Sequence, residues 1–123
     1  MTTTLSSKDR LIFALDVPDK SEAQRLVKLL RGSVGCFKVG LELFVREGPD
    51  ILKLIKDHSS AEIFLDLKLH DIPATVRGAL RSAAKLGVKY ITIHSTEGEA
   101  ILEASKEVKD SGLEVLAVTL LTS

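Results

Sequence analysis

Apolar and polar residues follow one another along the chain as short apolar runs separated by longer amphipathic segments. Five runs are rich in β-branched and apolar residues, and their first residues lie about 25 to 27 positions apart. This spacing suits a strand, a turn, a helix and a second turn, so each run is predicted to be a strand. The runs are LIFAL from Leu11, CFKVG from Cys36, EIFLDL from Glu62, KYITIH from Lys89 and EVLAVTLL from Glu114.

Four segments between these runs show helical periodicity. The first has Asp19 and Glu22 at capping-box spacing and the fourth has Thr96 and Glu99 at the same spacing, while the third begins at Pro73. The second is predicted to begin near a proline and the first, third and fourth to stop at glycines: Pro49, Gly32, Gly87 and Gly112. The apolar positions are Ala23, Leu26, Val27 and Leu30, then Ile51, Leu52, Leu54 and Ile55, then Val76, Ala79, Leu80 and Ala83, and finally Ile101, Leu102 and Val108.

Strands that alternate with helices predict an α/β fold with a parallel sheet, because parallel strands need crossover connections. No linker or low-complexity tract divides residues 1–123. The periodicity alone leaves two architectures open. One is an open five-stranded sheet that lacks its last helix, and the other is the first half of a TIM (β/α) barrel, with about five strands and four helices. A closed barrel takes about 250 residues, so this chain would be roughly half of one.

Composition and charge exclude several partners and locations. Lysine plus arginine and aspartate plus glutamate number 17 each, so no net charge points to nucleic acid or to a membrane surface. The single cysteine, Cys36, rules out an internal disulfide and fits a reducing compartment. The first ten residues lack the apolar core of a signal peptide, and no apolar run reaches membrane-span length. We therefore expect a soluble cytoplasmic protein.

The stretch FLDLKLHDIP, residues 64–73, places charges inside an apolar run. Side chains alternate across a strand, so Asp66 and Lys68 are predicted to share one face while leucines occupy the other. A structural ion pair is the simpler interpretation of Asp-x-Lys. Lys38 on the preceding strand and Asp71 just beyond favour a reactive site instead, since catalytic groups gather at the carboxyl ends of parallel strands.

Other polar residues admit structural interpretations. Asp16 can open a turn after the first strand, or contact a ligand. His70 and His94 can be histidines satisfied within the structure, and Cys36 a packed thiol. No pair has zinc-ligand spacing and lysines would repel a cation, so no metal is predicted. The glycines form neither a dinucleotide-binding nor a P-loop pattern.

The sequence DLKLHDIPATV resembles the signature of the orotidine 5'-monophosphate decarboxylase family. The resemblance extends to IFALDVPD, FKVGLELFVREGP and AVTLLTS in the family's order, and so covers essentially the whole chain. It implies a (β/α) barrel and a carboxy-lyase that converts orotidine 5'-monophosphate to uridine 5'-monophosphate in de novo pyrimidine biosynthesis. No metal or cofactor is implied.

The resemblance also assigns roles by position. Lys68 would donate the proton to C6, flanked by Asp66 and Asp71, and Lys38 would complete the charge chain. The remaining substrate contacts would be Asp16 and Lys38 to the ribose, Ile72 and Thr75 along the site, and Thr122 near the pyrimidine. The family's homodimer places Asp71 and Thr75 in the partner subunit's site.

The chain departs from the family's pattern in length. The phosphate-binding arginine and the closing loop would fall in a C-terminal half that is absent, since barrel phosphate sites commonly follow strands seven and eight. Residues 1–123 are therefore expected to be the N-terminal part of one barrel domain, inactive alone, with exposed apolar edges on the first and fifth strands.

Two other functions remain alternatives. A related sugar-phosphate decarboxylase or synthase on the same barrel would need a metal-binding acidic residue. A phosphoacceptor signalling domain would use Asp66 at the end of the third strand, but would need an acidic pair after the first strand and a lysine after the fifth.

Overall fold

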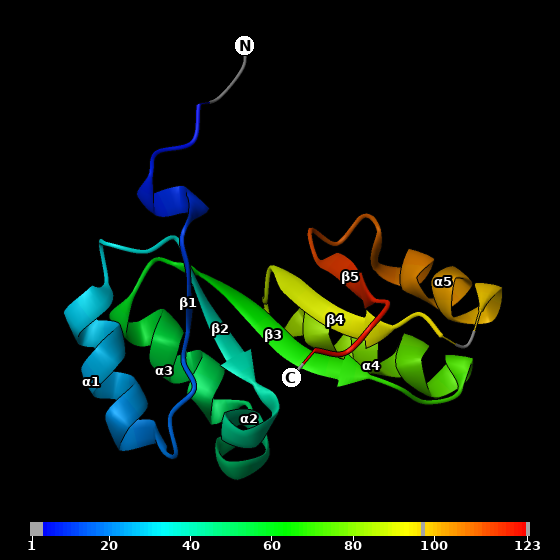
Figure 1. Ribbon diagram of the computed structural model, residues 1–123, viewed down its shortest axis with the longest axis horizontal. Coiled ribbons are helices and arrows are strands. Elements are labelled where there is room, and N and C mark those ends of the chain that lie inside the picture. The colour runs from blue at the N-terminus through cyan, green and yellow to red at the C-terminus, as the bar shows by residue number, and fades with distance from the viewer. Residues whose placement is uncertain (1–3, 97, 123) are drawn as a thin grey trace. The chain divides into compact units, whose positions relative to one another are not determined.

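The computed structural model describes residues 4–96 and 98–122, and these form two compact units. One unit reaches to Phe64 and the other begins at Leu65. Figure 1 labels the helices and strands of both units. Strands occur in all five predicted runs, and the sheet order follows the chain, β1-β2-β3-β4-β5. The strands are β1 (Ile12–Ala14), β2 (Cys36–Gly40), β3 (Glu62–Leu69), β4 (Tyr90–His94) and β5 (Glu114–Val118). The pairs β1–β2 and β4–β5 are parallel, as predicted.

Helices connect these strands. The α-helices are α1 (Lys20–Leu30), α2 (Leu41–Glu47), α3 (Asp50–His58), α4 (Pro73–Lys85) and α5 (Glu99–Ser105), and two 3₁₀ turns are η1 (Lys8–Arg10) and η2 (Lys106–Val108). Helix α1 begins as predicted, because the Asp19 carboxylate accepts the amide of Glu22 at 3.0 Å. Helix α4 begins at Pro73, where the missing N–H is not needed.

Helix α2 was not predicted from the sequence. It follows β2 without a loop, with Gly40 as its N-cap, and only Leu43 is buried. Leu41 and Val45 lie on the same short helix but are 58% and 75% exposed. A seven-residue helix with one buried position gives no 3.6-residue periodicity to detect. The chain therefore has five α-helices among its described residues rather than four.

The predicted start of the fourth helical segment was wrong. Helix α5 begins at Glu99, directly after Gly98. Gly98 has a φ of +84°, which is unfavourable for residues that carry a β-carbon, and no side chain caps the helix. Thr96 therefore does not serve as the N-cap. Leu102, one of the apolar positions of this segment, is 46% exposed, while Ile101 and Ala104 are buried.

The unit before Leu65 packs α1 and α3 against each other. Ala23 and Val27 of α1 and Ile51 and Ile55 of α3 are buried there. Beneath them, Phe13 and Phe37 face each other across the β1–β2 register with their rings edge to face, 6.4 Å between centroids.

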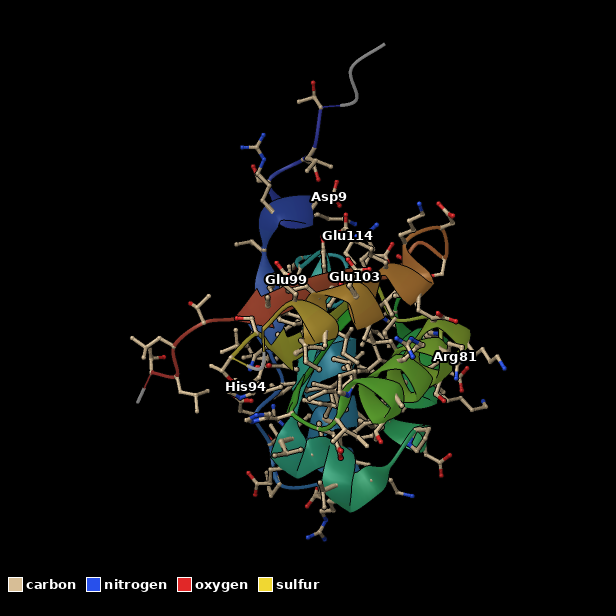
Figure 2. All side chains as sticks on the ribbon, turned by 90° about the vertical axis from the view of Figure 1, so that its right-hand side faces the viewer. Asp9, Arg81, His94, Glu99, Glu103 and Glu114 are labelled. Carbon is tan, nitrogen blue, oxygen red and sulfur yellow. The ribbon has the colours of Figure 1, made fainter. Side chains whose placement is uncertain are left out.

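The unit from Leu65 onward packs α4 against α5 and η2. Val76 and Leu80 of α4 are buried, as are Ile91 and Ile93 of β4. On the outer side Arg81 projects from α4 and its guanidinium lies 3.1 Å from the carboxylate of Glu107 on η2 (Figure 2). This ion pair is solvent-exposed, so its contribution to stability is small.

The outermost strands expose apolar side chains, as expected. Ile12 in β1 is 53% exposed and Leu116 in β5 is 43% exposed. Leu120 and Leu121, which follow β5, are also exposed. Exposed apolar side chains on an edge strand favour pairing with another strand.

Cys36 is a buried thiol on β2, as the packed interpretation predicted. Burial, with a smaller contribution from the Glu62 carboxylate, raises its pKa to about 11. The thiolate is the reactive form, so iodoacetamide should modify the native chain slowly at pH 8 and the denatured chain rapidly. Because the raised pKa disfavours ionisation in the folded state, stability should fall as pH rises from about 8.5, the ordinary thiol pKa, toward 11. The modification is followed by mass spectrometry, and rapid modification of Cys36 in the native chain at pH 8 would contradict its burial.

Candidate functional site

Asp66 and Lys68, the two charges predicted to share a face of β3, form an ion pair. The Lys68 ammonium donates to Asp66 Oδ2 at 2.9 Å. The Asp66 side chain is 11% exposed and the Lys68 side chain 41% exposed. The Asp66 carboxylate is therefore largely buried, while the Lys68 ammonium remains accessible to a ligand.

Thr92 on β4 completes this cluster, and it was not predicted as a site residue from the sequence. Its hydroxyl donates to Asp66 Oδ1 at 2.7 Å and accepts the backbone amide of Lys68 at 2.9 Å. Thr92 is 6% exposed. A hydroxyl in the centre of the apolar run KYITIH was the available signal, because a buried polar group needs hydrogen-bond partners.

Lys68 itself departs from regular strand geometry. Its φ is +51°, and among the described residues no other non-glycine has a positive φ. An L-residue in this left-handed region costs roughly 1–2 kcal/mol. Simple alternation along β3 therefore gives the correct pairing of Asp66 with Lys68, but it does not describe how the backbone turns at the lysine.

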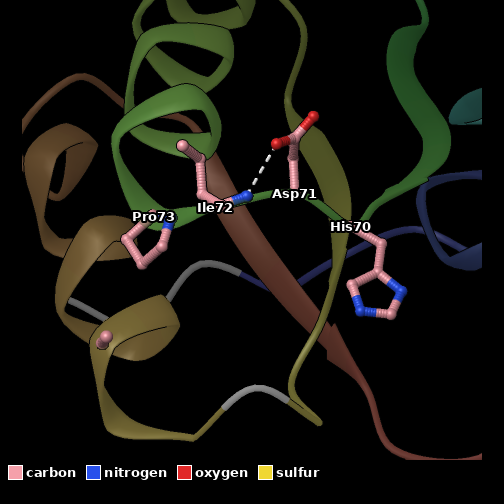
Figure 3. A pocket seen from close by; sticks show the side chains of 5 residues that line it. His70, Asp71, Ile72 and Pro73 are labelled. Atoms are coloured by element: carbon pink, nitrogen blue, oxygen red, sulfur yellow. Dashed lines mark hydrogen bonds between the residues drawn. The ribbon is translucent and has the colours of Figure 1, made fainter.

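Asp71, Ile72 and Thr75 lie where β3 leads into α4. Asp71 Oδ1 accepts the amide of Ile72 at 2.7 Å just ahead of the helix, and Figure 3 shows its carboxylate projecting in a different direction from the His70 ring. Asp71, Thr75 and Lys68 line one hollow, while Asp71, Ile72 and Pro73 line a neighbouring open one. Asp71 and Ile72 are exposed, with Ile72 66% accessible.

His70 and His94 stack on each other. Their ring centroids are 4.7 Å apart and their planes differ by 26°. His94 ends β4 (Figure 2), and His70 follows β3 directly. This contact supports the structural interpretation given to both histidines.

Asp16 and Lys38 form a second, looser pair in the unit before Leu65. The Lys38 ammonium lies 3.9 Å from Asp16 Oδ1, and the Asp16 side chain is 69% exposed. Asp16 comes just after β1, and Lys38 lies in the middle of β2. A backbone hydrogen bond holds the two segments together here, because the Leu15 amide donates to the Lys38 carbonyl at 2.8 Å.

Thr122, the remaining predicted site residue, follows β5 and is exposed. Ser123 lies outside the described residues. Within residues 4–96 and 98–122, no three histidine, cysteine or acidic side chains gather in a way that could hold a metal. None of the helices in that part of the chain is long and apolar enough to cross a membrane.

Residues 9–123 match the protein family described as "Orotidine 5'-phosphate decarboxylase / HUMPS family". Similar curated proteins include the orotidine 5'-phosphate decarboxylase of Desulfosudis oleivorans, 51% identical over 94% of this chain and 47% of that protein. That of Syntrophotalea carbinolica is 46% identical over 97% of this chain and 52% of the relative. The chain thus spans about half the length of the curated relatives it matches.

Solved structures give the same result for the fold. The orotidine 5'-phosphate decarboxylase of Pyrococcus horikoshii matches with a TM-score of 0.77 and 31% identity, over 86% of this chain and 49% of that one. An uncharacterized conserved protein from Geobacillus kaustophilus matches with a TM-score of 0.82 and 39% identity, over 91% and 55%. These similarities favour part of a (β/α) barrel over an open five-stranded sheet.

Proposed function

Because the chain belongs to the orotidine 5'-phosphate decarboxylase / HUMPS family, we propose that it supplies the proton donor for decarboxylation of orotidine 5'-monophosphate. The product is uridine 5'-monophosphate, and the reaction is a cofactor-independent carboxy-lyase step of pyrimidine biosynthesis. The observation that carries the proposal is the Lys68 ammonium, anchored on buried Asp66 at 2.9 Å yet 41% exposed. A cation held in one place but open to solvent can act on a bound ligand.

The chemistry requires such a cation. Cleavage of the bond from C6 to its carboxylate leaves the electron pair on C6 as carbon dioxide departs, and the pyrimidine offers no conjugated sink for that pair. A fixed ammonium stabilises the developing charge electrostatically. Lys68 then transfers a proton from Nζ to C6 as a general acid and regains a proton from solvent.

The other residues have supporting roles in this proposal. Asp66 would lie beside the departing carboxylate, where repulsion between like charges is relieved as carbon dioxide leaves. Asp16 and Lys38 would bind the ribose hydroxyls, and Lys38 would also extend the charge chain. Ile72, Thr75 and Thr122 would line the site. Binding of the parts of the substrate remote from C6 would then help to orient the reacting ring.

The whole enzyme would need more chain than residues 1–123. Since barrel phosphate sites commonly follow strands seven and eight, we place the phosphate-binding residues in the portion of the relatives that this chain does not match. The chain alone should therefore lack useful activity. A single buried thiol, Cys36, fits an enzyme of the cytoplasm.

The test is to join this chain to the C-terminal remainder of the Desulfosudis oleivorans relative, a protein called the joined enzyme below. Release of carbon dioxide from orotidine 5'-monophosphate is measured for the joined enzyme and for the chain alone. We expect turnover by the joined enzyme only. Full turnover by the chain alone would show that the phosphate site is not needed, and absence of turnover by a folded joined enzyme would overturn the proposed function.

A homodimer with shared sites gives a separate prediction. Asp71 is exposed and points away from the His70 side, which suits a residue that serves a partner subunit. Joined enzymes carrying Lys68→Ala or Asp71→Ala should each be nearly inactive, but mixed dimers contain one site with both native residues. Mixing the two, with subunit exchange, should restore part of the activity. Mixtures that stay as inactive as either variant would show that Asp71 acts within its own subunit.

A further inference from the structure

We propose that Thr92 is a positioning residue for Lys68: its hydroxyl holds the lysine backbone and the Asp66 carboxylate together, so that the ammonium is presented in one orientation. The structural part of this inference stands on hydrogen bonds within one unit. Its consequence for catalysis rests on the proposed function.

The Thr92 hydroxyl both donates and accepts a hydrogen bond. It donates its only proton to Asp66 Oδ1 at 2.7 Å and accepts the Lys68 amide at 2.9 Å. A hydroxyl has one proton to give, so accepting from the amide and donating to the carboxylate fixes its rotation. With Thr92 6% exposed, water has little access to replace either bond.

The backbone at Lys68 needs this support. A regular strand amide donates to a carbonyl of the neighbouring strand, whereas the Lys68 amide donates to a side chain. Its φ of +51° is unfavourable for a residue with a β-carbon. Conformations of this kind persist only where surrounding contacts enforce them, and they gather at functional sites.

The contacts form a closed circuit through Lys68. The lysine amide bonds to Thr92, Thr92 bonds to one oxygen of Asp66, and the other oxygen of Asp66 accepts the lysine ammonium at 2.9 Å. Lys68 is thus held at its backbone and at the tip of its side chain. Loss of the Thr92 hydroxyl would therefore break the hydrogen bonds to the Lys68 backbone amide and to Asp66 Oδ1 at the same time.

A different result is expected if Thr92 only stabilises the fold and does not position Lys68. Loss of the hydroxyl would then lower stability while leaving the conformation of Lys68 and the kinetics unchanged. Valine is the matched replacement, because it keeps the β-branched shape that strands favour and removes only the hydrogen bonds. Thr92→Ser keeps the hydroxyl, and Ile91→Val on the same strand controls for general destabilisation.

The first measurement uses NMR on the chain itself. In the native chain the Thr92 hydroxyl proton should exchange slowly and show a nuclear Overhauser effect to the Lys68 amide proton, a readout that needs no variant. In Thr92→Val, exchange of the Lys68 amide should accelerate roughly tenfold, corresponding to one lost hydrogen bond, and its amide-to-Hα coupling should change. Thr92→Ser and Ile91→Val should leave both near native values. Native values in Thr92→Val, or a hydroxyl proton remote from that amide, would overturn the proposal.

The second measurement is steady-state kinetics of the joined enzyme. Thr92→Val should lower kcat on the order of 100-fold, the effect of misplacing a catalytic group by about an ångström, with a much smaller change in KM. Thr92→Ser should recover most of the loss. Unchanged kcat in Thr92→Val would overturn the positioning role while leaving decarboxylation intact. Altered Lys68 geometry in a joined enzyme that decarboxylates nothing would instead overturn the proposed function.

Discussion

Replacing Lys68 with alanine should reduce decarboxylation by the joined enzyme by a factor of about 10⁴ or more, since it removes both a general acid and a fixed charge at the reacting carbon. The Lys68 ammonium is the exposed member of a pair whose other member is buried. Alanine leaves the carboxylate in place but removes the group that can reach a ligand. The rate of carbon dioxide release measures the effect.

Lys53→Ala is the matched control for this prediction. Lys53 also forms a short ion pair, 2.7 Å from Asp57, but on the outer face of α3 with its side chain 75% exposed. Such surface pairs contribute little to stability. Lys53→Ala should keep native turnover. If Lys68→Ala retained more than a few per cent of the native rate, another group would have to be the proton donor.

Replacing Asp66 with asparagine should be the more damaging change for the fold, even though the two side chains have the same shape. The carboxylate accepts on both oxygens, from Thr92 at 2.7 Å and from Lys68 at 2.9 Å. An amide has one acceptor oxygen, so in either orientation its NH₂ group faces a donor. Leaving a buried partner unsatisfied costs about 1–3 kcal/mol.

Two readouts separate the effects of Asp66→Asn. Urea unfolding of the chain should show the loss of stability, and kcat of the joined enzyme should fall because the lysine has lost its charged anchor. Asp57→Asn, at the exposed pair on α3, should change neither by much. Native stability together with native kcat in Asp66→Asn would show that the carboxylate holds nothing in place.

The strands and most helices could be predicted because their signals are local. The five apolar runs became β1 to β5, and the Asp19 cap and Pro73 marked α1 and α4 where the structure begins them. Helix α2 escaped because it is seven residues long with a single buried position. Gly98 displaced the expected cap of α5, since a positive-φ glycine can begin a helix without any side-chain bond.

The site could be predicted only as far as charges in strands reveal it. Asp66 and Lys68 stood out because charged residues in an apolar run demand partners. Thr92 did not, because threonine is common in strands and its partners lie 24 and 26 positions away in sequence. The positive φ of Lys68 likewise has no signature in the sequence, since lysine gives no indication of a left-handed backbone.

The most direct test of the central claim is a substrate comparison with the joined enzyme. Orotidine 5'-monophosphate and a keto-sugar phosphate are supplied separately, and release of carbon dioxide and conversion of each substrate are followed. We predict that the joined enzyme decarboxylates orotidine 5'-monophosphate to uridine 5'-monophosphate without added metal and leaves the keto-sugar phosphate unchanged. Conversion of the keto-sugar phosphate, with no carbon dioxide from orotidine 5'-monophosphate, would contradict the account.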